Sequence, residues 1–444
     1  MIVFTQVSGK LQHINLAAQG AAGQSIQARI ATLNTDKPGS QPDVLTEGFY
    51  SARSPEISCD GEMMLFTAQQ KEGDNWQIWE MNLSNSKLTR VTSIPENCFD
   101  PAYLPDGRVI FSKQTGKDNL NSGLTLFRCN PDGSDLKQIT YNPYCYSSAT
   151  VLNDGRVLAL CRQPDSANGE DVFMVLRPDG TKNELFYSGT QGTRPVTLGW
   201  ETMTGTIIFI ETARDRTDGG DIISISYNRP LHSHHNLSSE IEGNFISVFP
   251  LKSGKYLVSY RKSESDRYGL YEFDPENKVL SKSVYSSNEF DIADIVAVEK
   301  HERAKKLPSE VDMGVKTGLL LCQNANLHDI NESISAKLAG VNKIRIIGKD
   351  SALGEIDVEK DGSFYLKVIA DTPFQIQTVD DKGNVVGDPC GWIYLRPNER
   401  RGCVGCHEDH ELVPENKVPL AVKMAPVNVP VHISNVLEKK VSLE

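Results

Sequence analysis

The sequence predicts a mostly β protein, in which a six-bladed β-propeller is followed by a small β-sandwich-like domain and an irregular C-terminal segment. Three observations support this prediction. Tight turns recur at a nearly constant spacing up to residue 298, other strand-like runs begin near residue 316, and few such runs remain after residue 388. The constant spacing is the strongest observation, because a sandwich of unrelated strands would not keep a period.

The repeat is marked by turn glycines between short apolar runs. These glycines stand at positions 61, 107, 155, 205 and 254, so the steps are 46, 48, 50 and 49 residues. In one example, Pro105-Asp106-Gly107 precedes the apolar run 108–112. A second turn often follows within the unit, as at residues 130–133. Each unit therefore holds about four strands, which is the content of a propeller blade.

The N-terminal residues are expected to complete a sixth blade. Residues 2–5 resemble the second strand of a blade, and residues 27–33 resemble the next one. The first strand of that blade is missing at the N-terminus. We predict that residues 292–298 supply it and close the ring, so that the propeller spans residues 1–299.

After the propeller, residues 300–315 are predicted to form a charged linker, since His301–Pro308 is rich in charge and ends at a proline. Residues 316–388 are predicted to form the sandwich-like middle domain. Its antiparallel strands are expected at 318–322, 343–347, 354–358, 361–368 and 374–379. Residues 389–444 form the last segment, which contains one sharp motif.

Composition narrows the classes of partner. The chain of 444 residues has 23% charged residues and a formal net charge of -12, which argues against nucleic acid as a partner. An acidic surface would suit a basic redox partner protein, and a small-molecule substrate is the other expected partner. No apolar run is long enough to span a bilayer. Residues 1–5 lack the features of a secretory signal. We expect that a signal, or a lipoprotein signal giving membrane attachment, has been removed.

Nine cysteines are present, and only Cys403 and Cys406 form a close pair. The other seven are scattered and odd in number, so they do not predict a disulfide framework. Cys403 and Cys406 belong to the motif C-x-x-C-H, which ends at His407. Two thiols at this spacing can add to the two vinyl groups of haem, and the histidine can bind the iron as axial ligand. One covalent haem c is therefore predicted.

Two other interpretations of the motif remain open. A zinc site would use the same residues, but it needs two further ligands, and no second C-x-x-C is present. A dithiol redox pair is usually found in a βαβ context, which the sequence does not predict here.

Further residues near the motif are candidates for haem contacts. His410 and Met424 are the candidate sixth ligands of the iron, with Met424 or an open site favoured over His410. Arg396, Arg400 and Arg401 precede the motif. They could pair with the haem propionates, since guanidinium groups bind carboxylates with two hydrogen bonds, or they could form a solvated basic turn.

A second cluster, formed by His232, His234 and His235, lies at a connection between predicted strands. It could bind a metal ion, but a solvated loop is the favoured interpretation, because short motifs often occur by chance.

The segment from Trp392 to Glu408 resembles the haem segment of the hydrazine synthase alpha subunit-like family. Residues 361–364 and 370–373 resemble the middle domain of that family, and the blades resemble its propeller and that of TolB-like proteins. This resemblance extends over nearly the whole chain. It implies a six-bladed propeller, a middle domain with one haem c, and export to the periplasm or cell surface, because haem c is attached outside the cytoplasm.

One position departs from that family. In the synthase, a tyrosine four residues beyond the motif histidine binds the iron, and the histidine faces a zinc ion. Here Glu411 occupies the matching position, and no tyrosine follows the motif. The synthase also has a further domain with a second haem, which this sequence does not contain. We therefore expect His407 to be an ordinary iron ligand, with zinc as the alternative, and we expect a reaction other than hydrazine synthesis.

Together, these features predict an exported monohaem c-type cytochrome-like protein in electron transfer or small-molecule redox chemistry. An oxidoreductase with an open haem face is one rival. The other is a haem-free propeller scaffold that binds a carbohydrate or protein partner, with Cys403, Cys406 and His407 as a zinc or thiol site.

Overall fold

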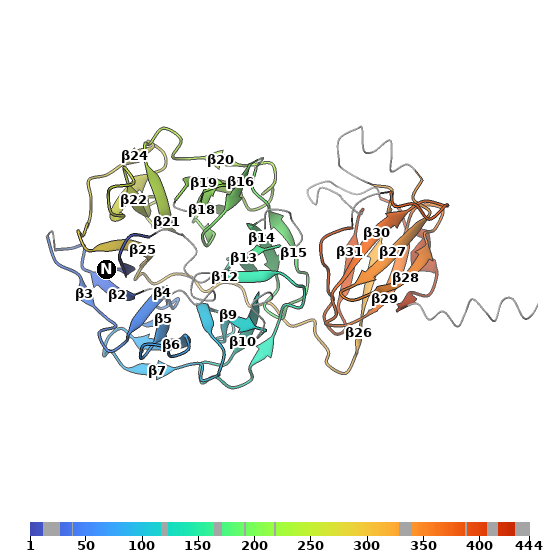
Figure 1. The fold of residues 1–444 in the computed structure, drawn as a ribbon, viewed down its shortest axis with the longest axis horizontal. Coiled ribbons are helices and arrows are strands. Elements are labelled where there is room, and N and C mark those ends of the chain that lie inside the picture. The colour runs from blue at the N-terminus through green and yellow to red at the C-terminus, as the bar shows by residue number, and fades with distance from the viewer. Residues whose placement is uncertain are drawn as a thin grey trace, which may run out of the picture. The chain divides into compact units, whose positions relative to one another are not determined.

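The computed structural model describes residues 1–11, 27–37, 39–116, 123–163, 171–190, 192–216, 219–327, 340–386, 389–405 and 416–430. The chain divides into two compact units. The first contains residues 1–140, 144–178 and 184–307. The second contains residues 308–444 together with the short segments 141–143 and 179–183. Figure 1 shows the first unit as a ring of sheets, and the second contains two further sheets.

The first unit is a six-bladed propeller, as predicted. Five of its sheets are built from consecutive strands. They are β4 (Ser51–Ile57), β5 (Met63–Gln69), β6 (Gln77–Asn82) and β7 (Leu88–Arg90); β8 (Cys98–Tyr103), β9 (Val109–Thr115), β10 (Gly123–Cys129) and β11 (Lys137–Gln138); β12 (Cys145–Val151), β13 (Val157–Arg162), β14 (Asp171–Leu176) and β15 (Glu184–Tyr187); β16 (Thr193–Pro195), β17 (Trp200–Glu201), β18 (Thr206–Ala213), β19 (Asp221–Ser226) and β20 (His235–Asn236); and β21 (Asn244–Pro250), β22 (Tyr256–Arg261), β23 (Gly269–Asp274) and β24 (Val279–Leu280).

The sixth blade joins the two ends of the propeller sequence. It consists of β25 (Phe290–Ala297), β1 (Ile2–Ser8), β2 (Ala28–Leu33) and β3 (Asp43–Val44), in that order. β25 pairs antiparallel with β1, so that Ile2 lies opposite Ala297. The predicted closure of the ring is confirmed. Since this pairing joins residues almost 300 positions apart, it holds the ends of the propeller chain together.

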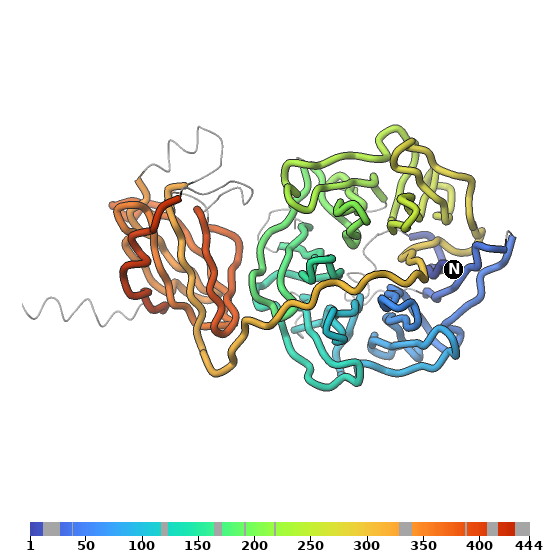
Figure 2. Tube along the Cα trace, turned by 180° about the vertical axis from the view of Figure 1, so that it is seen from behind, coloured from blue at the N-terminus to red at the C-terminus, as the bar shows by residue number. Residues whose placement is uncertain are grey.

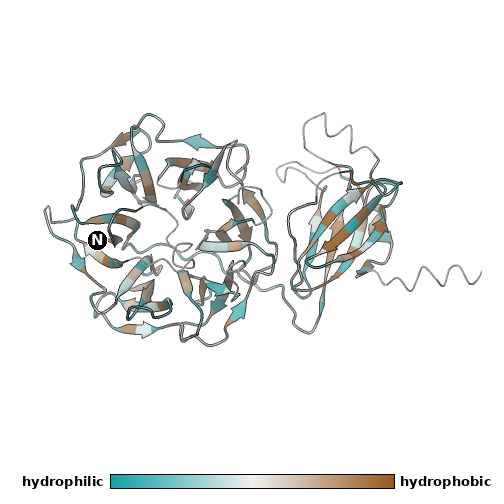
Figure 3. Cartoon of the chain, in the orientation of Figure 1, coloured by the Kyte–Doolittle hydropathy of each residue, from teal (hydrophilic) through white to brown (hydrophobic). Residues whose placement is uncertain are grey.

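Apolar side chains from neighbouring blades pack against each other. Figure 3 shows hydrophobic and hydrophilic stretches alternating along the strands, as expected for sheets that bury their faces between blades. Phe173 of β14 meets Phe209 of β18 edge to face, with ring centroids 5.0 Å apart. Tyr187 of β15 packs on the same Phe209 ring at 5.3 Å. These contacts join two consecutive blades.

The chain that follows β25 lies on one face of the propeller. Figure 2 shows this segment running across the ring. The backbone N–H of His301 donates to the carbonyl of Cys59 at 2.9 Å, and that of Lys305 donates to the carbonyl of Asn153 at 3.0 Å. Both carbonyls belong to turns between the first two strands of a blade. Residues 301–305, which fall in the predicted linker, are therefore bonded to the propeller.

The second unit is a β-sandwich. One sheet contains β31 (Arg400–Cys403), β26 (Thr317–Cys322), β29 (Phe364–Ile369) and β32 (Val427–Val429), in that order. The other contains β28 (Ala352–Asp357), β27 (Lys343–Gly348) and β30 (Phe374–Val379). Buried residues of both sheets form one apolar core, which includes Leu320, Ile344, Leu366 and Ile376.

The five expected sandwich strands are present, but two edge strands were not expected. β31 and β32 come from the segment predicted to be irregular, together with the short 3₁₀ helix η1 (Leu420–Lys423). Both edge strands pair parallel to their neighbours, β26 and β29. Their four and three residues are too few to show an alternating pattern, which explains why they were missed.

Among the described residues, no helix has the length and apolar character needed to cross a membrane.

Candidate functional site

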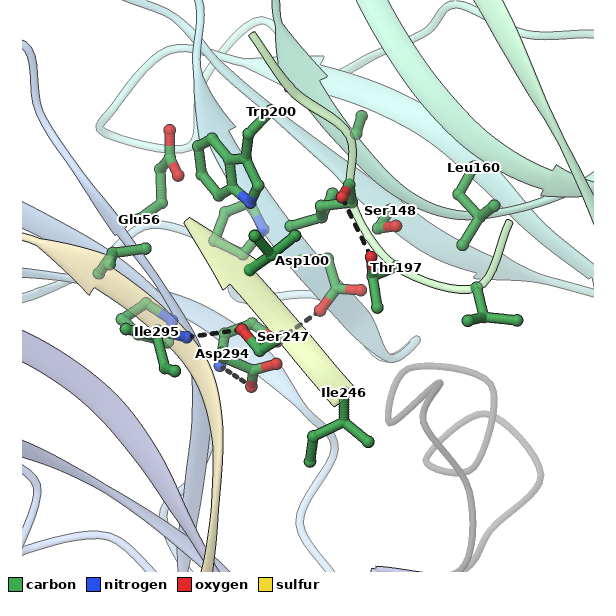
Figure 4. Close-up of a pocket in the computed structure, with 18 residues that line it drawn as sticks. Glu56, Asp100, Ser148, Leu160, Thr197, Trp200, Ile246, Ser247, Asp294 and Ile295 are labelled. Atoms are coloured by element: carbon green, nitrogen blue, oxygen red, sulfur yellow. Dashed lines mark hydrogen bonds between the residues drawn. The ribbon is translucent and has the colours of Figure 1, made fainter. Parts of the chain in front are cut away.

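The innermost strands of all six blades line a common cavity of about 90 Å³. Figure 4 shows polar side chains from separate blades around this space, including Asp100, Ser247 and Asp294. Glu56 and Ser148 also belong to its wall. Such a volume has room for several water molecules. The wall of the propeller channel therefore combines apolar and polar side chains from separate repeats.

Ser54 connects two carboxylates in this cavity. Its hydroxyl donates to Asp100 Oδ1 at 2.6 Å, and its backbone N–H donates to Asp294 Oδ2 at 3.1 Å. Asp294 Oδ2 also accepts a hydrogen bond from the hydroxyl of Thr5 at 2.9 Å. Three blades thus share one hydrogen-bonded chain, because each carboxylate has partners on other strands.

The same three residues have an unusual backbone conformation. Ser54, Asp100 and Asp294 have φ angles of 54°, 47° and 44°. A register shift, as in a β-bulge, interrupts the strand pairing of each blade at this place. Bulges redirect side chains, and left-handed conformations cost a residue other than glycine about 1–3 kcal/mol. The backbone is therefore strained at the three positions where these polar groups are directed towards one another.

A buried arginine lies beside the two carboxylates. Arg53 has no exposed surface, and its guanidinium group stacks on the rings of Trp76 and Phe99 at 4.6 and 5.2 Å. None of its three side-chain nitrogens has a hydrogen-bond partner within the described part of the chain. Asp100 and Asp294 supply the opposing charge. A buried cation is stable only near such negative charge, so these residues depend on one another.

Burial also changes the acidity of the channel carboxyls. It raises the pKa of Glu56 to about 8. Burial likewise raises the pKa of Asp100 to about 6, although the charge of Arg53 and the hydrogen bond from Ser54 oppose this rise. The pKa of Asp294 is raised for the same reason. The charge of the channel therefore changes within the physiological pH range.

Sequence analysis missed these channel residues, although a signal was present. Ser54, Asp100 and Ser247 each precede the turn glycine of their blade by seven residues. This position faces the cavity in each of these blades. Aligning the repeats on their glycines would have predicted the lining, but not the bulges that direct the side chains.

In the second unit, the C-x-x-C-H motif begins on an edge strand. Cys403 is the last residue of β31. It is half-buried and packs against the sandwich core. The backbone N–H of Gln323 donates to the carbonyl of Cys403 at 2.9 Å, and that of Asn324 donates to the carbonyl of Val404 at 3.1 Å. Cys406, His407, His410 and Glu411 lie outside the described residues. The fold therefore fixes the position of the first predicted haem attachment point.

The next residue of the motif is packed against the backbone. A side chain at Gly405 would collide with the carbonyl group of Leu327. Leu327 itself is 40% exposed. Cys403, two residues before Gly405, is only half-buried, as a thioether bond to a cofactor would require. The described residues are therefore compatible with haem at this edge.

Two of the three candidate arginines already have carboxylate partners. Arg396 is buried, pairs with Asp371 at 2.9 Å, and lies over the ring of Tyr141 at 4.7 Å. Arg401 pairs with the buried carboxylate of Glu399 at 2.8 Å. Both guanidinium groups hold the turn before the motif in place. A role in binding haem propionates stays a prediction for both.

Arg400 and Met424 lie on the surface. Arg400 is exposed on β31. Met424 follows η1 and is 62% exposed, so its side chain is not packed in the protein core. Arg400 is the candidate propionate partner with the most accessible side chain. The proposed iron ligation by Met424 or His410 also stays a prediction.

The histidine cluster does not assemble as a group. His232 and His235 are exposed, whereas His234 Nε2 lies 2.8 Å from Oε2 of the buried Glu211. Tyr187 donates its hydroxyl to Oε1 of the same carboxylate at 3.1 Å. Within the described ranges, no group of three or more His, Cys, Asp or Glu side chains could hold a metal ion. The half-buried His234 is therefore paired with a buried carboxylate, which the sequence did not reveal.

Fold and site together define a propeller followed along the chain by a β-sandwich whose edge strand carries the first cysteine of a C-x-x-C-H motif. Comparison with known proteins agrees with this class. Residues 294–408 match the family described as the hydrazine synthase alpha subunit middle domain. The chain is 22% identical to hydrazine synthase subunit alpha of Kuenenia stuttgartiensis over 492 aligned positions, which cover 82% of this chain.

One solved structure shows the same fold. The structure of Kuenenia stuttgartiensis hydrazine synthase has a TM-score of 0.81 at 20% identity and covers 95% of this chain and 71% of that one. TolB from Acinetobacter baumannii has a TM-score of 0.46 at 13% identity, covering 66% of this chain and 65% of that one. The resemblance to the hydrazine synthase alpha subunit-like family is confirmed. The chain spans 61% of the length of the curated relative.

Proposed function

We propose that this chain is an exported monohaem c-type cytochrome-like protein, related to the hydrazine synthase alpha subunit, in electron transfer or small-molecule redox chemistry. Cys403 and Cys406 would hold the haem, and His407 would bind its iron. The observation that supports this proposal is the position of Cys403. It lies at the end of an edge strand, half-buried against the sandwich core, two residues before Gly405, which packs against the exposed Leu327.

A bound haem would supply an iron that accepts and releases one electron. The chain would contribute the attachment point, an apolar wall and the charges around it. The exposed guanidinium of Arg400 suits an acidic group, whereas Arg396 and Arg401 stabilise the turn through Asp371 and Glu399. The net charge of -12 would favour a basic redox partner.

Hydrazine synthesis itself is not part of this proposal. The sequence has Glu411 where the family resemblance implies an iron-binding tyrosine. A carboxylate is a different ligand from a phenolate, so the reactivity of the iron would differ.

The decisive experiment uses the full chain, exported in a host that attaches haem c. A pyridine-haemochrome spectrum after denaturation is expected to show a c-type band with about one haem per chain, since two thioether bonds hold one haem. Native oxidised and reduced spectra would then show whether the sixth position is filled. A colourless protein would contradict the proposal, and zinc analysis of that protein would test the alternative metal.

A further inference from the structure

Two cysteines that are 81 positions apart in sequence, Cys322 and Cys403, are neighbours in the sandwich. β26 ends at Cys322 and β31 ends at Cys403, and the parallel register pairs these two residues directly. Paired residues of a parallel ladder project from the same face, and adjacent strands lie about 4.8 Å apart. Disulfides need a Cα separation of roughly 4.4–6.8 Å, so the register is suitable for a bond.

The surroundings of the two sulfurs differ. Cys322 has no exposed surface, whereas Cys403 is half-buried. Both belong to the apolar cluster of the sandwich. The register is maintained beside them, because Leu319 donates to the carbonyl of Glu399 at 2.8 Å and Gln323 donates to that of Cys403 at 2.9 Å. One thiol can therefore be reached from solvent, and its neighbour is protected.

We propose that Cys322 and Cys403 form a reversible disulfide while the chain carries no haem. The consequence for haem rests on the function proposed above. A thioether bond requires Cys403 as a thiol, so a disulfide with Cys322 would withhold the attachment point until it is reduced. The pairing would thus regulate cofactor attachment at this site.

The chemistry is a thiol–disulfide exchange with a small disulfide, such as oxidised glutathione, as the oxidant. The Cys403 thiolate attacks the reagent, whose S–S bond breaks, and one glutathione thiol leaves. The Cys322 thiolate then attacks the mixed disulfide at Cys403, and the second glutathione thiol leaves. The two cysteines lose two electrons and two protons, and the reagent gains both as two thiols.

Two competing bonds must be distinguished. Cys406 is close to Cys403 in sequence, and Cys390 packs against the same core cluster. Trypsin separates these cases, since it cuts after Lys316, Lys337, Arg401 and Lys417. A bond from Cys322 joins peptide 317–337 to peptide 402–417, whereas a bond between Cys403 and Cys406 stays within 402–417.

The experiment uses the full chain from a cytoplasm without haem attachment. The protein is oxidised with glutathione disulfide, free thiols are blocked, and the tryptic peptides are identified by mass spectrometry. We expect the linked pair 317–337/402–417 in the native sequence, in Cys406→Ala and in Cys390→Ala, and its loss on reduction. Cys403→Ala should abolish it, and Cys406→Ala shows that Cys403 is the partner.

The inference is overturned if Cys406→Ala, folded and oxidised, yields no link between these peptides, or if the native chain joins Cys403 only to Cys406 or Cys390. Its failure can be told apart from failure of the proposed function. If the exported chain attaches haem but the haem-free chain, once oxidised, shows no Cys322 link, the function stands and the pairing is rejected. A Cys322–Cys403 link in a chain that never takes up haem would do the reverse.

Discussion

The propeller channel and the sandwich edge assemble their polar groups in opposite ways. In the channel, Ser54 and Asp294 are 240 positions apart and meet only because the ring closes. In the second unit, the motif brings Cys403, Cys406 and His407 together within five consecutive residues of the sequence. The repeats therefore reveal the fold of the propeller but conceal its chemistry. The motif reveals chemistry in the second unit but not the strand that carries it.

Substitutions in the two regions should therefore affect the stability of the propeller differently. The channel groups support one another electrostatically, so loss of one should destabilise the propeller. Cys403 lies on an edge strand of the sandwich, so its loss should change the predicted haem attachment and leave the propeller intact.

The largest expected effect concerns the cofactor. The double variant Cys403→Ala/Cys406→Ala should reduce covalent haem from about one per chain to none, because no thiol remains to form a thioether bond. The haemochrome assay of the exported protein measures this directly. Cys129→Ala is the control, since Cys129 is buried in the propeller core. It should keep the haem, and a haem-containing double variant would refute the assignment.

Arg53→Met should give the next largest effect, on stability. Methionine keeps apolar contact with Trp76 and Phe99 but leaves Asp100 and Asp294 without the buried cation. Breaking a buried charge group in this way costs about 3 kcal/mol. Urea denaturation, followed by tryptophan fluorescence, measures the change.

An exposed arginine provides the comparison for Arg53. Arg90 stacks on Trp79 at 5.7 Å but lies on the surface, so Arg90→Met should cost less than about 1 kcal/mol. Adding Asp100→Asn to Arg53→Met should restore part of the loss, because one unpaired negative charge is removed. Equal stability of the two methionine variants would contradict a charge group in the channel.

The sequence predicted most of the propeller because its turns carry a local signal. Glycines such as Gly107, with φ of +88°, mark a backbone conformation that other residues avoid. Even the closing strand followed from counting blades. The edge strands β31 and β32 escaped prediction, since their pairing depends on parallel neighbours that are distant in sequence.

The candidate sites were predictable to different extents. The motif at Cys403 was found from spacing alone. The importance of Cys322 was not, because nothing in its sequence context distinguishes it from a small buried residue, and only the β26–β31 register brings it to Cys403. Arg53 was missed for a similar reason. A lone arginine in a strand gives no sign that it will be buried between two rings.

A comparison of two equivalent turns can show whether residues 301–305 are bound to the propeller. Gly107 and Gly155 have φ of +88° and +90° in neighbouring blades. A side chain at Gly107 would meet no atom within 4 Å, whereas one at Gly155 would collide with the carbonyl of Lys305. Gly107→Ala should therefore cost about 1 kcal/mol from backbone strain alone, and Gly155→Ala about 1–2 kcal/mol more.

The additional loss of stability in Gly155→Ala should arise because residues 301–305 are released from the turn. Trypsin is expected to cleave after Lys305 and Lys306 faster in Gly155→Ala than in Gly107→Ala, with urea denaturation giving the stabilities. If both variants are cleaved at the same rate, residues 301–305 are not held by the turn, and the propeller would end at β25.

The smallest expected effect is on the pH dependence of stability. Burial raises the pKa of Glu56 to about 8 and that of Asp100 to about 6, above their ordinary values near 4. Between the ordinary pKa and the raised pKa of each carboxyl, the folded protein binds a proton that the unfolded chain has released. The free energy of unfolding should therefore fall as the pH rises from about 5 to about 8.

Glu56→Gln should flatten this decline above about pH 6, where Asp100 has already ionised. Thermal denaturation across this range would then show a smaller loss of Tm. Glu47→Gln, on the surface, removes the same charge and should leave the slope unchanged. Identical slopes in both variants would place the titrating group outside the channel.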